Sequence, residues 1–194
     1  LTIISIVFEV YNLQGIENIK NSYQLIKASS QRLFLSQEVL NRVFELKMLN
    51  LGILTNTPAN YEVSVREKLE ETITLLSEYH NYIIFNSFGF SPEHTALMYD
   101  KSTPVAFYNE GSISFQDFDI NDATNQLISK AYSNAKEPLE NIVDNNPNVF
   151  FIIYNLLNGC YKSSKNSLKL FVEDLVYMIN NSQDILVYSI VISV

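Results

Sequence analysis

Residues 16–54 read IENIKNSYQLIKASSQRLFLSQEVLNRVFELKMLNLGIL, and this proline-free stretch decides the fold class. Glycine occurs only at its edges, at Gly15 and Gly52. Apolar or small residues recur at steps of three and four, which is typical of a helix face in a bundle. A second stripe widens that face, so we expect the helix to pack against at least two neighbours. The first stripe comprises Ile19, Tyr23, Ile26, Ser30, Leu33, Gln37, Leu40, Phe44 and Leu51, and the second comprises Leu25, Leu35, Val39, Val43 and Leu46.

The two ends of the sequence are uncharged apolar runs. Residues 1–8 read LTIISIVF and residues 185–194 read ILVYSIVISV. A helix that spans a membrane needs about 20 apolar residues, and neither run has that many by itself. We expect the runs to be the stubs of two transmembrane helices that flank a domain at residues 9–184. The alternative is a pair of β-strands, because both runs are short and rich in Ile and Val.

Three more helices are expected after the turn formers of residues 55–60. The first covers residues 63–85, with His80 on the same stripe as its apolar residues. The next covers residues 121–143, with a kink near Pro138. The last covers residues 149–184 and continues into the terminal apolar run, with Gly159 as its weak point. The inward apolar positions of the 63–85 helix are Val65, Leu69, Ile73, Leu76 and Ile83.

Residues 88–119 are different in kind, with two short apolar pieces at residues 105–108 and 113–118. The residues between them read NEGS, which predicts a β-hairpin. The fold class expected is therefore mostly α, an up-down-up-down four-helix bundle with a small β-hairpin insertion between the second and third helices. At about 1.5 Å per residue the outer helices are much longer than the middle two. They should continue side by side toward the membrane, with Ile16 and Ile19 facing residues 177–181.

Charge and motif content exclude several classes of function. The net charge is -8, and the thirteen basic residues are scattered, so a nucleic-acid partner is not expected. The single Cys160 excludes an internal disulfide. The sequence lacks phosphate-loop, dinucleotide, zinc and redox motifs. We therefore predict no cofactor, no metal, no catalytic residue and no enzymatic activity; Ser91 and His94 are too close together in a turn for a catalytic pair.

The ligand-binding candidates are Arg32, Arg66, His80 and Tyr82. Arginine is the favoured partner of carboxylate ligands, and a sensor built from a helical bundle could use either arginine. The alternative is that the arginines pair with glutamates of neighbouring helices. His80 lies beside tyrosines on a buried stripe, and its alternative is an ordinary core histidine. The glutamates expected as partners in that alternative are Glu38, Glu45 and Glu67.

Two apolar ends around a helical domain form an arrangement that resembles the extracytoplasmic sensor region between two transmembrane helices of chemoreceptor-like proteins. Residues 22–40, from SYQLI to SQEVL, and the high Asn content are similar to large ciliate membrane proteins related to tiny macrocysts, some of which carry PAS domains. The resemblance implies signal sensing at a membrane.

The function expected is a non-catalytic sensory or signal-transducing domain outside the cytoplasm, held in the membrane by both ends. The partners expected are an unidentified small ligand and a second copy of the chain, which would form a homodimer with coiled-coil packing. The alternative function is a structural or dimerisation segment of a membrane protein without a small-molecule ligand. A third interpretation, a soluble α+β enzyme, depends on the terminal runs being strands.

Overall fold

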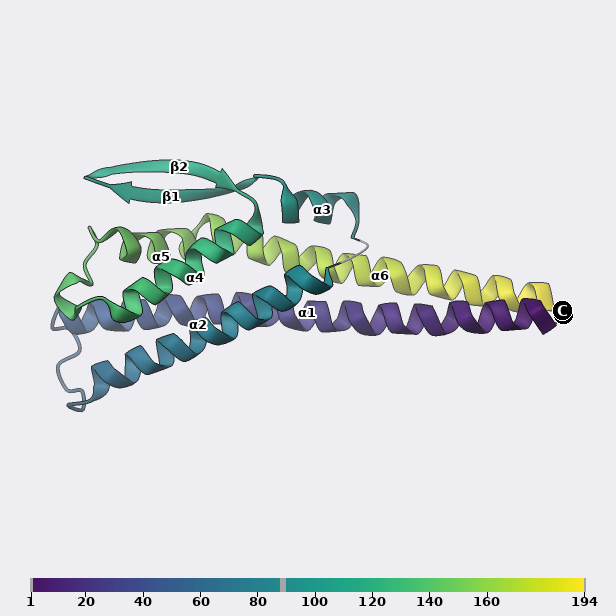
Figure 1. The fold of residues 1–194 in the computed structure, drawn as a ribbon, viewed down its shortest axis with the longest axis horizontal. Coiled ribbons are helices and arrows are strands. Elements are labelled where there is room, and N and C mark those ends of the chain that lie inside the picture. The colour runs from purple at the N-terminus through teal and green to yellow at the C-terminus, as the bar shows by residue number, and fades with distance from the viewer. Residues whose placement is uncertain (1, 88–89, 194) are drawn as a thin grey trace.

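The chain folds into two long antiparallel helices, with shorter helices and a small sheet packed against them at the end away from the termini (Figure 1). The computed structural model describes residues 2–87 and 90–193. Over these residues it contains six α-helices and one two-stranded antiparallel sheet. Helix makes up 76% of the structure, which confirms the prediction of a mostly helical protein with a small β-hairpin.

The two longest elements are α1 (Thr2–Asn50) and α6 (Gly159–Ser193), which run antiparallel and side by side (Figure 1). The first residues of α1 and the last residues of α6 extend together past every other element. We call this pair, residues 2–22 and 178–193, the stalk. Both terminal apolar runs lie in these helices where they are described, so the alternative of paired strands is wrong. Within the described residues, no helix combines the length and the hydropathy needed to cross a membrane.

Two shorter helices pack against the long pair. Helix α2 (Tyr61–Asn86) lies against α1 and carries the predicted buried stripe, including His80. Helix α3 (Pro92–Tyr99) lies against α6 (Figure 1). Only a hairpin was predicted over residues 88–119, so α3 is an additional element. Its start is nevertheless encoded locally, because the Ser91 hydroxyl accepts a hydrogen bond from the backbone of His94 and a proline occupies the first turn.

The hairpin comprises β1 (Thr103–Asn109) and β2 (Ser112–Phe118), close to the predicted strands. Its turn contains Glu110 and Gly111, both with positive φ, as a two-residue hairpin turn requires. Strand β1 is largely buried against α5 (Pro147–Leu157), whereas β2 is exposed along almost its whole length.

The largest differences from the predicted helix ends are at both ends of α1 and at the C-terminal end of α4. Helix α1 begins before residue 16 and ends at Asn50 rather than residue 54, because Gly52 has a φ of 65° and reverses the chain. Helix α4 (Ile120–Lys136) stops before Pro138 instead of continuing, kinked, to residue 143, and a 3-10 turn (Leu139–Asn141) follows. The helical conformation is unfavourable for a residue that precedes proline, so α4 ends before Pro138.

The predicted last helix is two helices, α5 and α6. They are separated at Asn158, whose φ of -130° and ψ of -110° lie outside the helical region. Gly159 begins α6 directly beside the backbone of β1. A side-chain Cβ there would lie 2.1 Å from the carbonyl oxygen of Pro104, so only glycine permits this approach.

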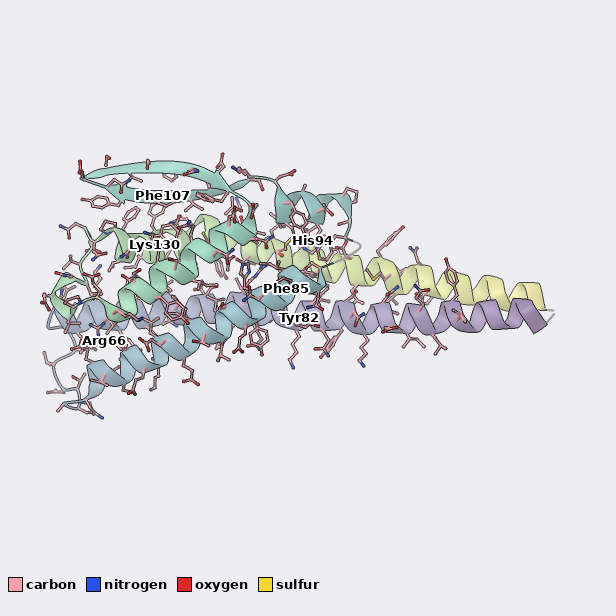
Figure 2. All side chains as sticks on the ribbon, in the orientation of Figure 1. Arg66, Tyr82, Phe85, His94, Phe107 and Lys130 are labelled. Carbon is pink, nitrogen blue, oxygen red and sulfur yellow. The ribbon has the colours of Figure 1, made fainter. Side chains whose placement is uncertain are left out.

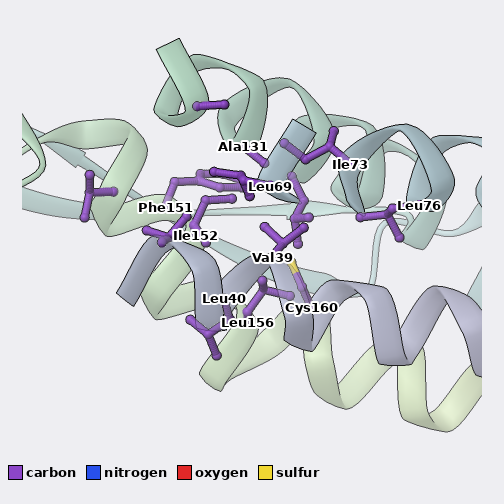
Figure 3. Close-up of a cluster of buried hydrophobic side chains, with 14 of the residues drawn as sticks. Val39, Leu40, Leu69, Ile73, Leu76, Ala131, Phe151, Ile152, Leu156 and Cys160 are labelled. Carbon is purple, nitrogen blue, oxygen red and sulfur yellow. The ribbon is translucent and has the colours of Figure 1, made fainter. Parts of the chain in front are cut away.

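The main core joins α1, α2, α4 and α5 (Figure 3). On α1 it contains Leu40 of the first predicted stripe together with four residues of the second, Leu35, Val39, Val43 and Leu46. Tyr23, Ser30 and Leu51 of the first stripe are exposed. A smaller cluster lies nearer the stalk and includes Phe171 of α6. The members of the main core labelled in Figure 3 are Val39, Leu40, Leu69, Ile73, Leu76, Ala131, Phe151, Ile152, Leu156 and Cys160.

Candidate functional site

Arg32 lies fully buried in the middle of α1, inside the molecule. Its Nη2 donates a hydrogen bond of 3.1 Å to the hydroxyl of Ser167 on α6. Its Nε and Nη1 have no hydrogen-bond partner among the side chains and backbone that the structure describes. Burial lowers the pKa of Arg32 to about 10, so the guanidinium still carries its charge at neutral pH. A buried charge without an opposite charge destabilises the folded state by several kcal/mol.

His80 of α2 is the second buried polar side chain at this level. Burial and the charge of Arg32 lower its pKa to about 3, so the imidazole is neutral at physiological pH. Asn121 and Asn125 of α4 raise the pKa of His80, although neither residue forms a hydrogen bond with the ring nitrogens. His80 is therefore a neutral group that packs near a positive charge.

His94 of α3 is the third member, and Figure 2 shows it beside α6. Its Nδ1 lies 2.8 Å from Oδ2 of Asp174 on α6. The ring is packed between Phe90 and Phe171, with centroid distances of 4.1 and 4.3 Å. Burial lowers the pKa of His94, and Asp174 opposes this shift while Arg32 adds to it. The pair ties α3, and with it the start of the insertion, to α6.

These side chains form one cluster, which we call the buried polar cluster: Arg32, His80, His94, Ser167 and Asp174. Its members come from α1, α2, α3 and α6, and the charge of Arg32 lowers the pKa of both histidines. Ser29 Oγ, Asn121 Oδ1 and the Nε2 of His94 are further buried polar atoms without a partner in the described part of the chain. Such atoms are rare in folded proteins, and each of them calls for a specific explanation.

The other two candidates lie elsewhere. Arg66 is near the far end of α2 in Figure 2, where its Nε pairs with Glu62 at 2.8 Å and its Nη1 donates to the carbonyl oxygen of Ala135 at 2.8 Å. It therefore neutralises the C-terminal end of α4, which is a structural role. The side chain of Tyr82 is 39% exposed and lies outside the buried polar cluster. The structure thus brings together only Arg32 and His80 of the four predicted residues.

The predicted pairing of arginines with glutamates is correct in part. Arg42 pairs with Glu38 at 3.2 Å and with Glu45 at 3.0 Å, but both partners belong to α1 itself. Arg66 pairs with Glu62 rather than Glu67. Arg32 forms no ion pair with any described acidic side chain.

A groove of about 680 Å³ lies between α1 and α6 in the stalk. Its lining includes Ile16 and Ile19 from α1 and Met178 and Ile179 from α6, which confirms that these parts of the two helices face each other. The contact is close, because a Cβ at Gly15 would lie 3.5 Å from the hydroxyl of Ser182.

Neither metal binding nor known relatives identify the site. Among residues 2–87 and 90–193, no group of three or more His, Cys, Asp or Glu side chains is placed to hold a metal ion. Comparison of the chain with protein-family models, curated proteins and solved structures finds no match.

Proposed function

We propose that this chain is a non-catalytic sensory domain that lies outside the cytoplasm and is joined at both ends to the membrane helices of a larger protein. The observation that carries the proposal is the stalk, because α1 and α6 alone continue past the rest of the domain. A change in the core that moves α1 against α6 would therefore reach the stalk. Shifts of about 1–2 Å between packed helices are an established means of transmitting a binding event.

The same proposal includes the finer architecture. We infer an up-down-up-down four-helix bundle formed by α1, α2, α4 and the continuous layer of α5 and α6. The insertion of α3 and the hairpin lies between the second and third helices of this bundle. The resemblance to sensor regions of chemoreceptor-like and tiny-macrocysts-like proteins belongs to the same proposal.

Disulfide cross-linking in membranes tests the stalk as the signal path. In a Cys160→Ser background, Gly15→Cys with Ser182→Cys should cross-link readily within one chain, because their side chains start within contact distance. Ser22→Cys with Met178→Cys is a second pair, since Ser22 Oγ and Met178 Sδ are 3.2 Å apart. Failure of both pairs would reject this topology and the mechanism built on it.

A matched control uses Tyr23→Cys in place of Ser22→Cys. Tyr23 is the next residue of α1, but it is exposed, whereas Ser22 is buried against α6. Tyr23→Cys with Met178→Cys should cross-link at least tenfold more slowly. Equal rates for both pairs would show that α1 rotates freely in the stalk and transmits no defined motion.

The alternative function, a dimerisation segment, is favoured by one observation. Large apolar side chains of the stalk and its base are more than half exposed. They are Val10, Tyr11, Leu13, Ile16, Val176 and Tyr177. Analytical ultracentrifugation in detergent, combined with single-cysteine variants at Leu13 and Tyr177, would detect a dimer by its mass and by cross-links between chains. A soluble α+β enzyme is not proposed, because that interpretation depended on terminal strands.

A further inference from the structure

Arg32 is a charged group that the fold buries without giving it an opposite charge. It is fully buried, only its Nη2 has a partner, and that partner is a neutral hydroxyl. The acidic side chain in the cluster, Asp174, is hydrogen-bonded to His94 instead. Replacement of such a buried ion by an apolar side chain often stabilises a protein, so stability alone gives no reason for an arginine at this position.

The surroundings of Arg32 supply further hydrogen-bond donors. His80 of α2 lies near enough to Arg32 for its charge to lower the pKa of the imidazole, and neither ring nitrogen of His80 has a partner among the described residues. The neutral ring therefore has one N–H free to donate. Ser29, one turn before Arg32 on α1, has an unpartnered hydroxyl. An oxygen-bearing anion accepts hydrogen bonds from the Arg32 guanidinium, from the one N–H of neutral His80 and from the Ser29 hydroxyl, and it neutralises the guanidinium, which binds carboxylates and oxyanions in a planar fork.

We propose that Arg32, with His80 and Ser29 near it, is the binding site for a small oxygen-bearing anion, with a carboxylate as its simplest form. This inference names the ligand class for the proposed sensory function and rests on it for the consequence of binding. The unpartnered nitrogens are closed off from solvent, so an anion reaches them only when the helices around Arg32 separate. Binding therefore selects a more open packing of α1 against α2, α3 and α6.

The test measures the thermal unfolding of the full chain in formate, acetate, nitrate and chloride at one ionic strength. An oxyanion at about 100 times its Kd should raise the Tm of the wild-type protein by about 5–10 °C relative to chloride. The variant Arg32→Met should lose this difference completely. In chloride its Tm should be higher than that of the wild type by about 2 °C or more, because an unpaired buried charge has been removed.

Arg66→Met is the matched control, because it removes an arginine that already has a carboxylate partner and two carbonyl contacts. It should lower the Tm and keep the anion effect. An equal rise in Tm for wild type and Arg32→Met would overturn the proposed site, because the rise would then be a general effect of the salt on stability. A lowered Tm in Arg32→Met with no anion effect in wild type would overturn it too, because Arg32 would then be a structural residue.

Coupling is measured separately from binding. Addition of the stabilising anion should change the rate of the Gly15→Cys with Ser182→Cys cross-link in the Cys160→Ser background at least threefold. If the anion raises the Tm but does not change the cross-linking rate, the anion site at Arg32 is supported and the signal path through the stalk is rejected. If the cross-link forms normally but the anion has no effect on the Tm, the pairing of α1 with α6 is supported and the anion site is rejected.

Discussion

Buried histidines make the stability of this domain depend on pH. The pKa of His80 falls from 6.5 in the unfolded chain to about 3 in the fold. Between these values the unfolded chain binds a proton that the folded chain does not, so the free energy of unfolding falls as pH decreases. Near pH 5.5, one such histidine contributes a slope of about 1.2 kcal/mol per pH unit.

Urea unfolding of wild type and His80→Leu at pH 5 and pH 6 measures this contribution. The variant should lose less stability over this interval by about 1 kcal/mol, since carboxylates titrate mainly below it. His94 remains as an internal reference, because its own pKa is also lowered. Identical slopes in the two proteins would mean that His80 is hydrated or charged in the fold.

Asn155 of α5 joins the sheet to the helices through two buried hydrogen bonds to β1. Its side chain accepts a hydrogen bond from the backbone N–H of Ala106 at 2.8 Å and donates to the carbonyl oxygen of the same residue at 2.9 Å. Asn155→Leu should cost about 2–3 kcal/mol, because two buried backbone groups lose their partner. The matched control is Asn86→Leu, whose exposed side chain forms only a local hydrogen bond to Tyr82. Chemical denaturation should show a change below about 0.5 kcal/mol for the control.

Part of the buried polar cluster could be predicted from residue types alone, and the rest could not. Arg32 and His80 could be selected because arginine and histidine are rare here and lie on helical stripes. The second stripe of α1 was correctly predicted to be buried, but the polar part of the same face was missed, because a search for apolar residues skips Ser22, Ser29, Arg32 and Ser36. The pairing of His94 with Asp174 joins residues 80 positions apart, and no local pattern encodes such a contact.

At the scale of elements, the break between α5 and α6 depends on Gly159. Gly159→Ala should cost about 1–3 kcal/mol or more, because its methyl group meets the Pro104 carbonyl and the backbone must move. Gly15→Ala is a matched control, since its methyl group would be in ordinary contact with Ser182. That control should gain about 0.5–1 kcal/mol from helix propensity. Thermal melts of both variants compare them, and a tolerated Gly159→Ala would show that α6 can shift away from β1.

Element types followed from the sequence more reliably than element ends. Periodicity identified α1, α2 and α4, and turn residues identified the hairpin. Periodicity alone could not show that Pro138 would end α4 rather than bend it, because both outcomes relieve the same clash. It could not separate α5 from α6 either, because that break arises from the approach of β1 to Gly159. Helix α3 is only eight residues long and has no resolvable period.

At the scale of the whole molecule, the described core residues lie away from the stalk. The two buried clusters begin at Leu25 and end at Phe171. Deletion of residues 1–8 and 186–194 should therefore leave the thermal transition of the core within about 3 °C and should improve monodispersity, because apolar surface is removed. Size-exclusion chromatography and calorimetry test both expectations. Loss of the transition would place the terminal runs in the core and contradict a membrane attachment.

The pairing of α1 with α6 in the stalk also sets an order of events in folding. The contact between Ser22 and Met178 joins residues 156 positions apart, so in an unfolded chain it closes a loop of almost the whole domain. The entropy lost on closing such a loop falls sharply once the core has brought the helices together. Mutations in the stalk should therefore change the rate of unfolding and leave the rate of folding almost unchanged, which corresponds to kinetic φ-values near zero. During synthesis, the stalk half of α1 would leave the ribosome early and wait for its partner until nearly all of the domain had been made.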